Sequence, residues 1–288
     1  MTENILAKAI EASNKANRAQ IEDYFGNNGL LYCGKCHTPK QFEIDDTFSI
    51  DKLKGLRINC LCECASKAVK EREAAEKERK RQEHIKELKR KCFRGETRLL
   101  SATFENDDKT NPKLTQLARQ YVSSFPALKQ EGKGLLLYGA VDQGKSFTAA
   151  CIANAILETN TPVLMSTFGQ IEAELQKDFN GRSQYYQELT DYPLLIIDDF
   201  GAERNTEYMQ EIVYTVINNR YSANRPLILT SNLSAREIQS QSDESTFYKR
   251  VYSRIFSCCM AYEVTGKQHR LEQARLTKAN MNSLFRIN

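Results

Sequence analysis

A short stretch that contains glycine and lysine has the spacing of a phosphate-binding loop. Residues 139 to 146 read GAVDQGKS and fit the pattern G-x-x-x-x-G-K-S. In such a loop, backbone N–H groups and the N-terminus of the next helix surround phosphate, Lys145 reaches the β and γ phosphates, and Ser146 holds Mg²⁺. Asp142 departs from the usual composition, because its carboxylate repels a triphosphate and a non-glycine residue disfavours positive φ. The stretch predicts a nucleotide site in which Asp142 lowers the affinity.

Two acids follow another apolar run further along the chain. The sequence PLLIIDDFG places Asp198 and Asp199 at the end of a predicted buried strand. In phosphoryl-transfer enzymes, one such acid supports Mg²⁺ and its neighbour orients the attacking water. We therefore expect Asp198 to assist the metal and Asp199 to act as general base. The structural alternative is that both acids cap the helix that follows.

Two further polar features follow the acids. The run LILTSN ends in Asn232, and the ends of parallel strands converge on a ligand crevice, so we expect this amide beside the γ-phosphate. Helix capping at Ser231 or Ser234 is the alternative. The segment YKRVYSRIFS places Arg250 and Arg254 four residues apart on one helical face. Such an arginine can reach a neighbouring subunit's ATP as an arginine finger, although a solvated pair is the more ordinary reading.

Cysteine is concentrated near the start of the chain. Of nine cysteines, five lie in one window: Cys33, Cys36, Cys60, Cys62 and Cys64. Structural Zn²⁺ takes four thiolate or imidazole ligands in a tetrahedron, so four of these five predict a zinc site, with His37 a less favoured ligand. Reduced buried thiols are the alternative. The other four cysteines are expected to pack as small apolar residues: Cys92, Cys151, Cys258 and Cys259.

The elements that position these residues fall into three predicted regions. Five short apolar runs alternate with amphipathic segments after residue 96, which indicates an α/β domain with a parallel sheet at 96–288. Residues 66–94 carry Glu–Lys pairs without glycine or proline, so the region 66–95 is predicted to be a charged linker helix. Residues 1–65 form the predicted zinc-binding domain, with a weak amphipathic helix at 5–16.

Composition and charge narrow the class of protein. The 288 residues are 41% hydrophobic and 27% charged, which is ordinary for a globular protein and indicates neither a membrane protein nor disorder. A net charge of +4 is too small to predict nucleic-acid binding, so any basic surface must be local. Because we find neither a signal peptide nor an apolar run of membrane-spanning length, we expect a cytoplasmic protein without a membrane partner.

Taken in order, the motifs resemble those of the DnaC and DnaI group of bacterial replicative helicase loaders, which are AAA+ P-loop ATPases. The matching stretches are SATFEND, GAVDQGKSF, LLIIDDFGAERNTEY, LILTSNL, RVYSRI and TGKQHR. The resemblance is closest to phage and Gram-positive members with an N-terminal zinc-binding domain. It implies a five-stranded parallel sheet of order 5-1-4-3-2, with ATP, Mg²⁺ and Zn²⁺ as cofactors.

The resemblance also implies roles for particular residues. Nucleotide and Mg²⁺ contacts are implied at Gly139, Gly144, Lys145, Ser146, Phe147 and Asp198. Catalytic roles are implied at Asp199, at Asn232 as sensor 1, at Arg254 as the finger and at Arg270 as sensor 2. Single-stranded DNA contacts are implied at Phe179, Thr206 and Tyr208, although ordinary helix packing explains the two aromatic residues equally well.

The function that these features favour is delivery of a DnaB-type hexameric helicase to single-stranded DNA by a slow, switch-like ATPase. The zinc region is implied to contact the helicase, and the ATPase domain to self-associate when ATP is bound. Two alternatives stay open. One is an IstB-like transposition helper that acts with a transposase on duplex DNA. The other is a zinc-dependent scaffold that binds nucleotide without hydrolysing it, which Asp142 keeps possible.

Overall fold

The computed structural model describes residues 20, 22–44, 55–94, 96–178, 180–266, 277, 278 and 281. The helix expected at 5–16 and the site residues Phe179 and Arg270 lie outside this range. The chain divides into two compact units, residues 1–81 and 82–288, and each is described by itself. None of the described helices combines the length and hydrophobicity that crossing a bilayer requires.

The first unit contains two small antiparallel hairpins. One pairs β1 (Tyr24–Phe25) with β2 (Leu31–Tyr32), and the other pairs β3 (Gln41–Glu43) with β4 (Arg57–Asn59). Lys40 and Asp23 form a buried ion pair at 2.6 Å. Asp23 also accepts a hydrogen bond from the backbone N–H of Gly34, so the pair fixes the start of the loop that carries the first two cysteines.

A long charged helix, α2 (Glu63–Phe93), contains residues of both units. It includes most of the predicted linker helix and begins slightly earlier. Exposed pairs such as Glu76–Lys80, at 3.4 Å, lie along it. Its buried residues are confined to the C-terminal third: Ile85, Cys92 and Phe93. The predicted charged helix is therefore present, and its side chains are exposed over most of its length.

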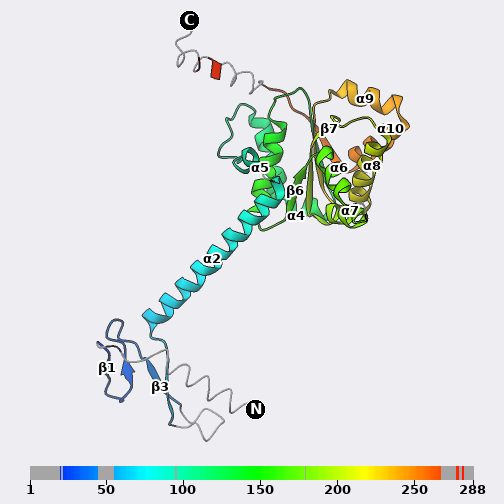
Figure 1. The fold of residues 1–288 in the computed structure, drawn as a ribbon. Coiled ribbons are helices and arrows are strands. Elements are labelled where there is room, and N and C mark those ends of the chain that lie inside the picture. Colours follow the sequence, from blue (N-terminus) through cyan, green and yellow to red (C-terminus); the bar gives the residue numbers. More distant parts are fainter. Residues whose placement is uncertain are drawn as a thin grey trace. The chain divides into compact units, whose positions relative to one another are not determined.

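The second unit is built on a five-stranded parallel sheet of order β6-β7-β8-β5-β9 (Figure 1). The strands are β5 (Gly134–Tyr138), β6 (Val163–Ser166), β7 (Leu194–Phe200), β8 (Leu227–Ser231) and β9 (Cys259–Glu263). Each corresponds to one of the five predicted apolar runs. Counted within this unit and read from the β9 edge, the order is 5-1-4-3-2, so the prediction is confirmed.

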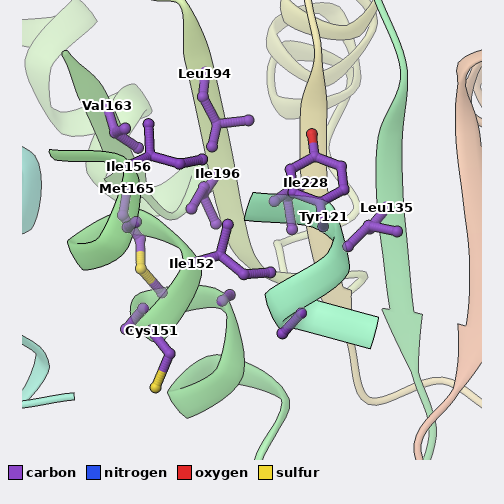
Figure 2. Close-up of a cluster of buried hydrophobic side chains, with 14 of the residues drawn as sticks. Tyr121, Leu135, Cys151, Ile152, Ile156, Val163, Met165, Leu194, Ile196 and Ile228 are labelled. Atoms are coloured by element: carbon purple, nitrogen blue, oxygen red, sulfur yellow. The ribbon is translucent and has the colours of Figure 1, made fainter. Parts of the chain in front are cut away.

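Helices cover both faces of this sheet and bury it completely at its centre (Figure 1). They are α3 (Thr97–Leu100), α4 (Pro112–Gln130), α5 (Lys145–Leu157), α6 (Phe168–Lys177), α7 (Arg182–Asp191), α8 (Glu207–Ser222), α9 (Ala235–Glu244) and α10 (Thr246–Cys258). Leu135 (Figure 2) packs on the α4 and α5 side, as does Leu137, whereas Leu136 packs on the side of α6, α8 and α10. This alternation follows from the two-residue period of a strand.

Helix α5 lies directly under the sheet because its contact residues are small. Ala149, Ala150 and Ala153 are fully buried, and apolar residues surround the helix on nearly every side. Close packing holds the N-terminus of α5 against the end of β5. The predicted phosphate-binding loop therefore joins two buried elements and has a fixed position.

Candidate functional site

The loop from Gly139 to Gly144 has the backbone shape that phosphate binding requires. Gly139 and Gly144 have φ values of 134° and 85°, in the region that favours glycine. A side chain at Gly139 would place its Cβ 2.5 Å from the carbonyl oxygen of Val264. The buried Lys145 ammonium donates to the carbonyl oxygens of Gly139, at 3.0 Å, and Ala140, at 2.6 Å, which places its charge over the loop.

Asp142 adopts positive φ, at 70°, despite its side chain. Asp and Asn are the non-glycine residues that tolerate this conformation best, at a cost of about 1–2 kcal/mol. Asp142 is thus compatible with the backbone conformation of the loop. Asp142 belongs to the lining of the pocket described next, so we expect its charge to bear on nucleotide binding.

A pocket of about 350 Å³ opens above the loop and gathers the predicted residues. From the sequence predictions it contains Gly144, Lys145, Ser146, Phe147, Asp199 and Asn232. Strands β5, β7 and β8 are neighbours in the sheet, and their carboxyl ends bring these side chains to one place. Polar residues and a phosphate-binding loop around a concave space are what a nucleotide site requires.

One wall of the pocket was not anticipated from the sequence. It comes from the segment before and at the start of α4 and contains Arg98, Asn106, Asp107, Asp108, Thr110 and Asn111. The amide of Asn111 donates to the carbonyl oxygen of Thr265, at 2.9 Å, which ties this wall to the chain that leaves β9. The clustering of Asn, Asp and Thr at 106–111 was the available signal, because such residues build ordered loops.

The two acids lie at an irregularity between β7 and β8. Asp199 has φ of 55°, and the strand pairing shifts between Ile197 and Phe200. Asp198 is half-buried and accepts a hydrogen bond from Thr230. Burial raises the pKa of Asp198, while hydrogen bonds with Thr230 and Ser146 act in the opposite direction. Asn232 donates to the carboxylate of Asp199 at 3.1 Å.

These contacts bear on the capping alternatives. Thr206 caps α8 by accepting from the N–H of Met209, and Ser234 caps α9 by accepting from that of Glu237. The two acids are therefore not the cap of α8. Ser234 does act as a cap, but Asn232 lines the pocket independently of it.

Three other predicted residues in the described part of the chain do not line this pocket: Thr206, Tyr208 and Arg254. Arg254 on α10 donates to Asn218 and to the hydroxyl of Tyr214, both at 2.9 Å, and its guanidinium lies 4.8 Å from the ring centre of Tyr214. Tyr208 on α8 accepts a hydrogen bond from Arg182 at 3.0 Å. Arg254 is thus absent from the nucleotide pocket of its own chain. An arginine that acts on the ATP of a neighbouring subunit is expected to lie outside its own pocket.

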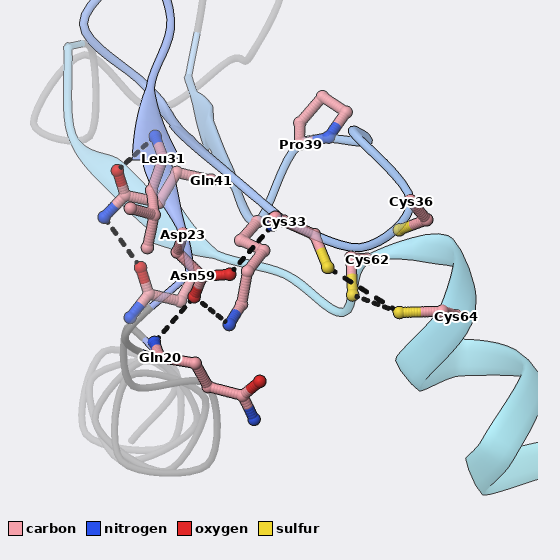
Figure 3. Close-up of polar contacts among 12 residues, drawn as sticks. Gln20, Asp23, Leu31, Cys33, Cys36, Pro39, Gln41, Asn59, Cys62 and Cys64 are labelled. Atoms are coloured by element: carbon pink, nitrogen blue, oxygen red, sulfur yellow. Dashed lines mark hydrogen bonds and ion pairs between the residues drawn. The ribbon is translucent and has the colours of Figure 1, made fainter.

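Four of the five clustered cysteines meet at one point in the first unit (Figure 3). Cys33 and Cys36 lie in the loop after β2, and Cys62 and Cys64 lie at the start of α2. Their sulfur atoms are all within 4.8 Å of one another, with 3.7 Å between Cys33 and Cys64 and 3.4 Å between Cys62 and Cys64. A tetrahedral zinc site with Zn–S bonds of 2.3 Å has sulfur atoms about 3.8 Å apart.

The thiol environments fit a bound cation. The hydroxyl of Thr38 lowers the pKa of Cys36 to about 5, and backbone N–H groups of Cys36 and Lys35 lower the pKa of Cys33. In contrast, hydrogen bonds with the thiols of Cys62, Cys36 and Cys33 raise the pKa of Cys64 to about 12, because they keep its proton in place. A divalent cation would replace the protons that the four sulfur atoms share. Four sulfur donors fit zinc, and the half-buried Asp198 carboxylate with the Ser146 hydroxyl fits Mg²⁺.

Two residues that the sequence left open lie outside this set of four. The Cys60 thiol lies 3.6 Å from the carbonyl oxygen of Pro39 instead of joining the cluster. The His37 ring is hydrogen-bonded to the hydroxyl of Tyr24 at 3.2 Å. The geometry thus selects Cys33, Cys36, Cys62 and Cys64 from the predicted candidates.

The fold agrees with what comparison with known proteins finds. The model of the family described as IstB-like ATP binding protein matches residues 63–277, which is most of the chain. The chain belongs to this family. The AAA+ resemblance expected from the motifs is confirmed, and the matched region contains every predicted nucleotide residue.

Curated relatives of this IstB-like chain include two kinds of protein. The replicative helicase loader DnaI of Bacillus subtilis is 31% identical over 186 residues, covering 60% of this chain and 59% of the relative. A putative ATP-binding protein in an insertion sequence of Mycobacterium tuberculosis is 31% identical over 134 residues, covering 46% and 53%. The chain therefore spans somewhat more than half the length of these relatives.

Solved structures match the same region. The crystal structure of the DnaC helicase loader has a TM-score of 0.51 at 21% sequence identity, covering 58% of this chain and 99% of that one. At this identity the likeness establishes the fold. It agrees with the five-stranded parallel sheet described above.

Removing the Asp142 charge from this IstB-like chain is expected to tighten ATP binding about tenfold. A carboxylate about 4 Å from one phosphate charge contributes repulsion of about 1 kcal/mol in water and more in a partly closed pocket. The loop already has positive φ, so the backbone conformation adds nothing to the binding equilibrium. Asp142→Asn and Asp142→Gly should therefore gain equally when a fluorescent ATP analogue is titrated. A gain for Asp142→Gly alone would contradict the electrostatic explanation.

Proposed function

We propose that this protein is an ATPase that loads a DnaB-type replicative helicase onto single-stranded DNA. The observation that carries the proposal is the pocket in which the phosphate-binding loop, Asp199 and Asn232 converge, on the same chain as a separate four-cysteine unit. The first feature suits ATP hydrolysis. The second suits an adaptor that contacts another protein.

In the proposed reaction, the N–H groups of the loop and Lys145 bind the β and γ phosphates of ATP. Ser146 and Asp198 would hold Mg²⁺, which supplies charge neutralisation of the phosphates when bound. Asp199 accepts a proton from the attacking water, and Asn232 fixes the direction of the Asp199 carboxylate through the bond at 3.1 Å. Arg254 would act on the ATP of a neighbouring subunit, with Arg270 as a further sensor.

The partners are proposed from the same arrangement. The unit that carries Cys33, Cys36, Cys62 and Cys64, with one Zn²⁺, would bind the helicase hexamer. Single-stranded DNA would contact Phe179, Thr206 and Tyr208, with Arg182 beside the Tyr208 ring, since stacking next to a cation holds bases without reading sequence. Support for a helicase partner comes from the DnaI and DnaC relatives, whose names describe that activity.

A loading assay on circular single-stranded DNA tests this function. A hexameric helicase cannot thread itself onto a circle, so unwinding of an annealed oligonucleotide should require this protein and ATP. The Lys145→Ala variant should give none, because it lacks the charge that binds the β and γ phosphates. Linear DNA with a long single-stranded tail is the matched control, where the helicase should start unaided. Equal unwinding of the circle with and without the protein would refute the loader function.

The second candidate is a transposition helper, and the relative from an insertion sequence favours it. In that case double-stranded rather than single-stranded DNA should stimulate phosphate release. The family match begins at residue 63, so residues 1–62, with three of the four clustered cysteines, lie outside it. That additional unit supports the helicase partner over the transposase. Absence of phosphate release from wild type with either DNA would instead favour a scaffold that only binds nucleotide.

A further inference from the structure

The end of β8 contacts both acids of the nucleotide site through a residue not yet assigned a role. Ile197 pairs with Leu229 and Phe200 pairs with Ser231, so Asp198 and Asp199 together lie opposite the single residue Thr230. Two residues facing one is a β-bulge. Such bulges recur next to active sites because they redirect side chains.

The bulge explains how two consecutive acids reach the same site. Consecutive side chains of a regular strand point to opposite faces of the sheet. Asp199 departs from extended backbone, with φ of 55°, and lines the pocket, while Asp198 interacts with Ser146, which also lines it. Without the bulge, one carboxylate would point away from the phosphate-binding loop.

The Thr230 hydroxyl is bonded on both sides of this bulge. It accepts a hydrogen bond from the backbone N–H of Asp199 at 3.0 Å and donates one to the carboxylate of Asp198. Thr230 is fully buried, so water does not compete for these bonds. The side chain thus replaces the strand-pairing partner that the bulge removes from Asp199 and at the same time fixes Asp198.

The two following residues hold the same segment at other points. Ser231 donates to the carbonyl oxygen of Phe200 at 2.7 Å, and Asn232 donates to the carboxylate of Asp199 at 3.1 Å. Thr230 differs from both because its hydroxyl contacts both acids: the carboxylate of Asp198 and the backbone N–H of Asp199.

We propose that Thr230 is a positioning residue whose hydroxyl maintains the Asp198–Asp199 bulge in the arrangement that binds Mg²⁺ with nucleotide. This inference rests on the nucleotide site of the proposed function. It assigns Thr230 no contact with substrate. Loss of the hydroxyl should therefore act on Mg²⁺ dependence and turnover, not on phosphate binding by the loop.

The test uses the full-length chain with a Thr230→Val substitution, which keeps the shape of the side chain and removes its hydroxyl. A fluorescent ATP analogue is titrated in EDTA and then at increasing Mg²⁺. The Mg²⁺ concentration at half-saturation should rise roughly 10- to 100-fold, as is typical when a residue that orients a metal ligand is lost. Affinity in EDTA should be unchanged, and Thr230→Ser should restore the wild-type Mg²⁺ dependence.

Thr190→Val is the matched control. Thr190 is also buried and donates to the carbonyl oxygen of Tyr186 at 2.8 Å, but lies on α7, outside the nucleotide pocket. The Thr190→Val variant should lose about as much thermal stability as Thr230→Val, without any change in Mg²⁺ dependence. If Thr230→Val does not fold, as judged by circular dichroism, Thr230→Ala replaces it in the same titration.

Two results would overturn the inference alone: wild-type Mg²⁺ dependence in Thr230→Val, or equal losses of affinity with and without Mg²⁺, which would indicate a merely structural role. A wild-type chain that bound no nucleotide would refute the proposed function, and this inference with it.

Discussion

Replacing Arg254 with alanine is expected to slow phosphate release by about a thousandfold or more, the usual effect of removing an arginine finger. ATP affinity should stay the same, because Arg254 is absent from the pocket of its own chain. The side chain is already positioned: it donates to Asn218, to Tyr214 and to the backbone carbonyl of Arg250. These bonds use one N–H on each nitrogen, so both terminal nitrogens keep a second N–H, a pair suited to phosphate oxygens.

Mixing two inactive variants tests whether Arg254 acts in trans. Lys145→Ala removes the ammonium that binds ATP phosphates but leaves Arg254 intact, and Arg254→Ala has the reverse defect. If one subunit completes the site of its neighbour, the mixture should recover part of the phosphate release that each variant lacks alone. No recovery in the mixture, or wild-type turnover in Arg254→Ala, would contradict the finger. Arg236→Ala, on the neighbouring helix α9, is a control for simple loss of surface charge.

The second large effect is expected at the cysteine cluster. Cys62→Ser should remove the zinc and unfold the first unit, because structural zinc contributes about 10–16 kcal/mol to the folding of small domains. Elemental analysis should give one zinc per wild-type chain and much less for Cys62→Ser. Cys33→Ser, Cys36→Ser and Cys64→Ser should show the same loss of metal. ATP binding by the second unit should persist in all four variants.

Cys60→Ser provides the matched control for the metal. Cys60 is only two residues from Cys62, but its thiol lies beside Pro39 rather than in the cluster. This variant should keep its zinc and its hydrogen-exchange protection in residues 22–44. Loss of zinc from Cys60→Ser, or full zinc in Cys62→Ser, would show that the ligand set is wrong.

The sequence alone predicted the features that depend on local pattern. The five strands were found because buried parallel strands are short apolar runs, and α2 because its residues favour helix over a long span. The phosphate-binding loop was found because its spacing is fixed by the geometry of one turn. The order of the strands came from the resemblance to helicase loaders, since periodicity does not determine which strands are neighbours.

Features that depend on contacts distant in sequence were missed. The wall containing Arg98 and Asp107 precedes the loop by more than a helix, and only the packing of α4 brings it to the pocket. The set of zinc ligands was ambiguous because Cys60, Cys62 and Cys64 follow one another at every second position. Which two of them face Cys33 and Cys36 depends on where β4 ends and α2 begins. The bulge opposite Thr230 depends on pairing between β7 and β8, which nothing in either strand alone reveals.

The positive φ of Asp199 also limits how this position can change during evolution. Few side chains tolerate that conformation: glycine accepts it readily, Asp and Asn moderately, and longer or β-branched residues poorly. An exchange of Asp199 for Glu keeps the negative charge, so it looks conservative. In this backbone it is not, because Glu lacks the short polar side chain that tolerates φ near 55°. The shape of the strand and the identity of its second acid can therefore change only together.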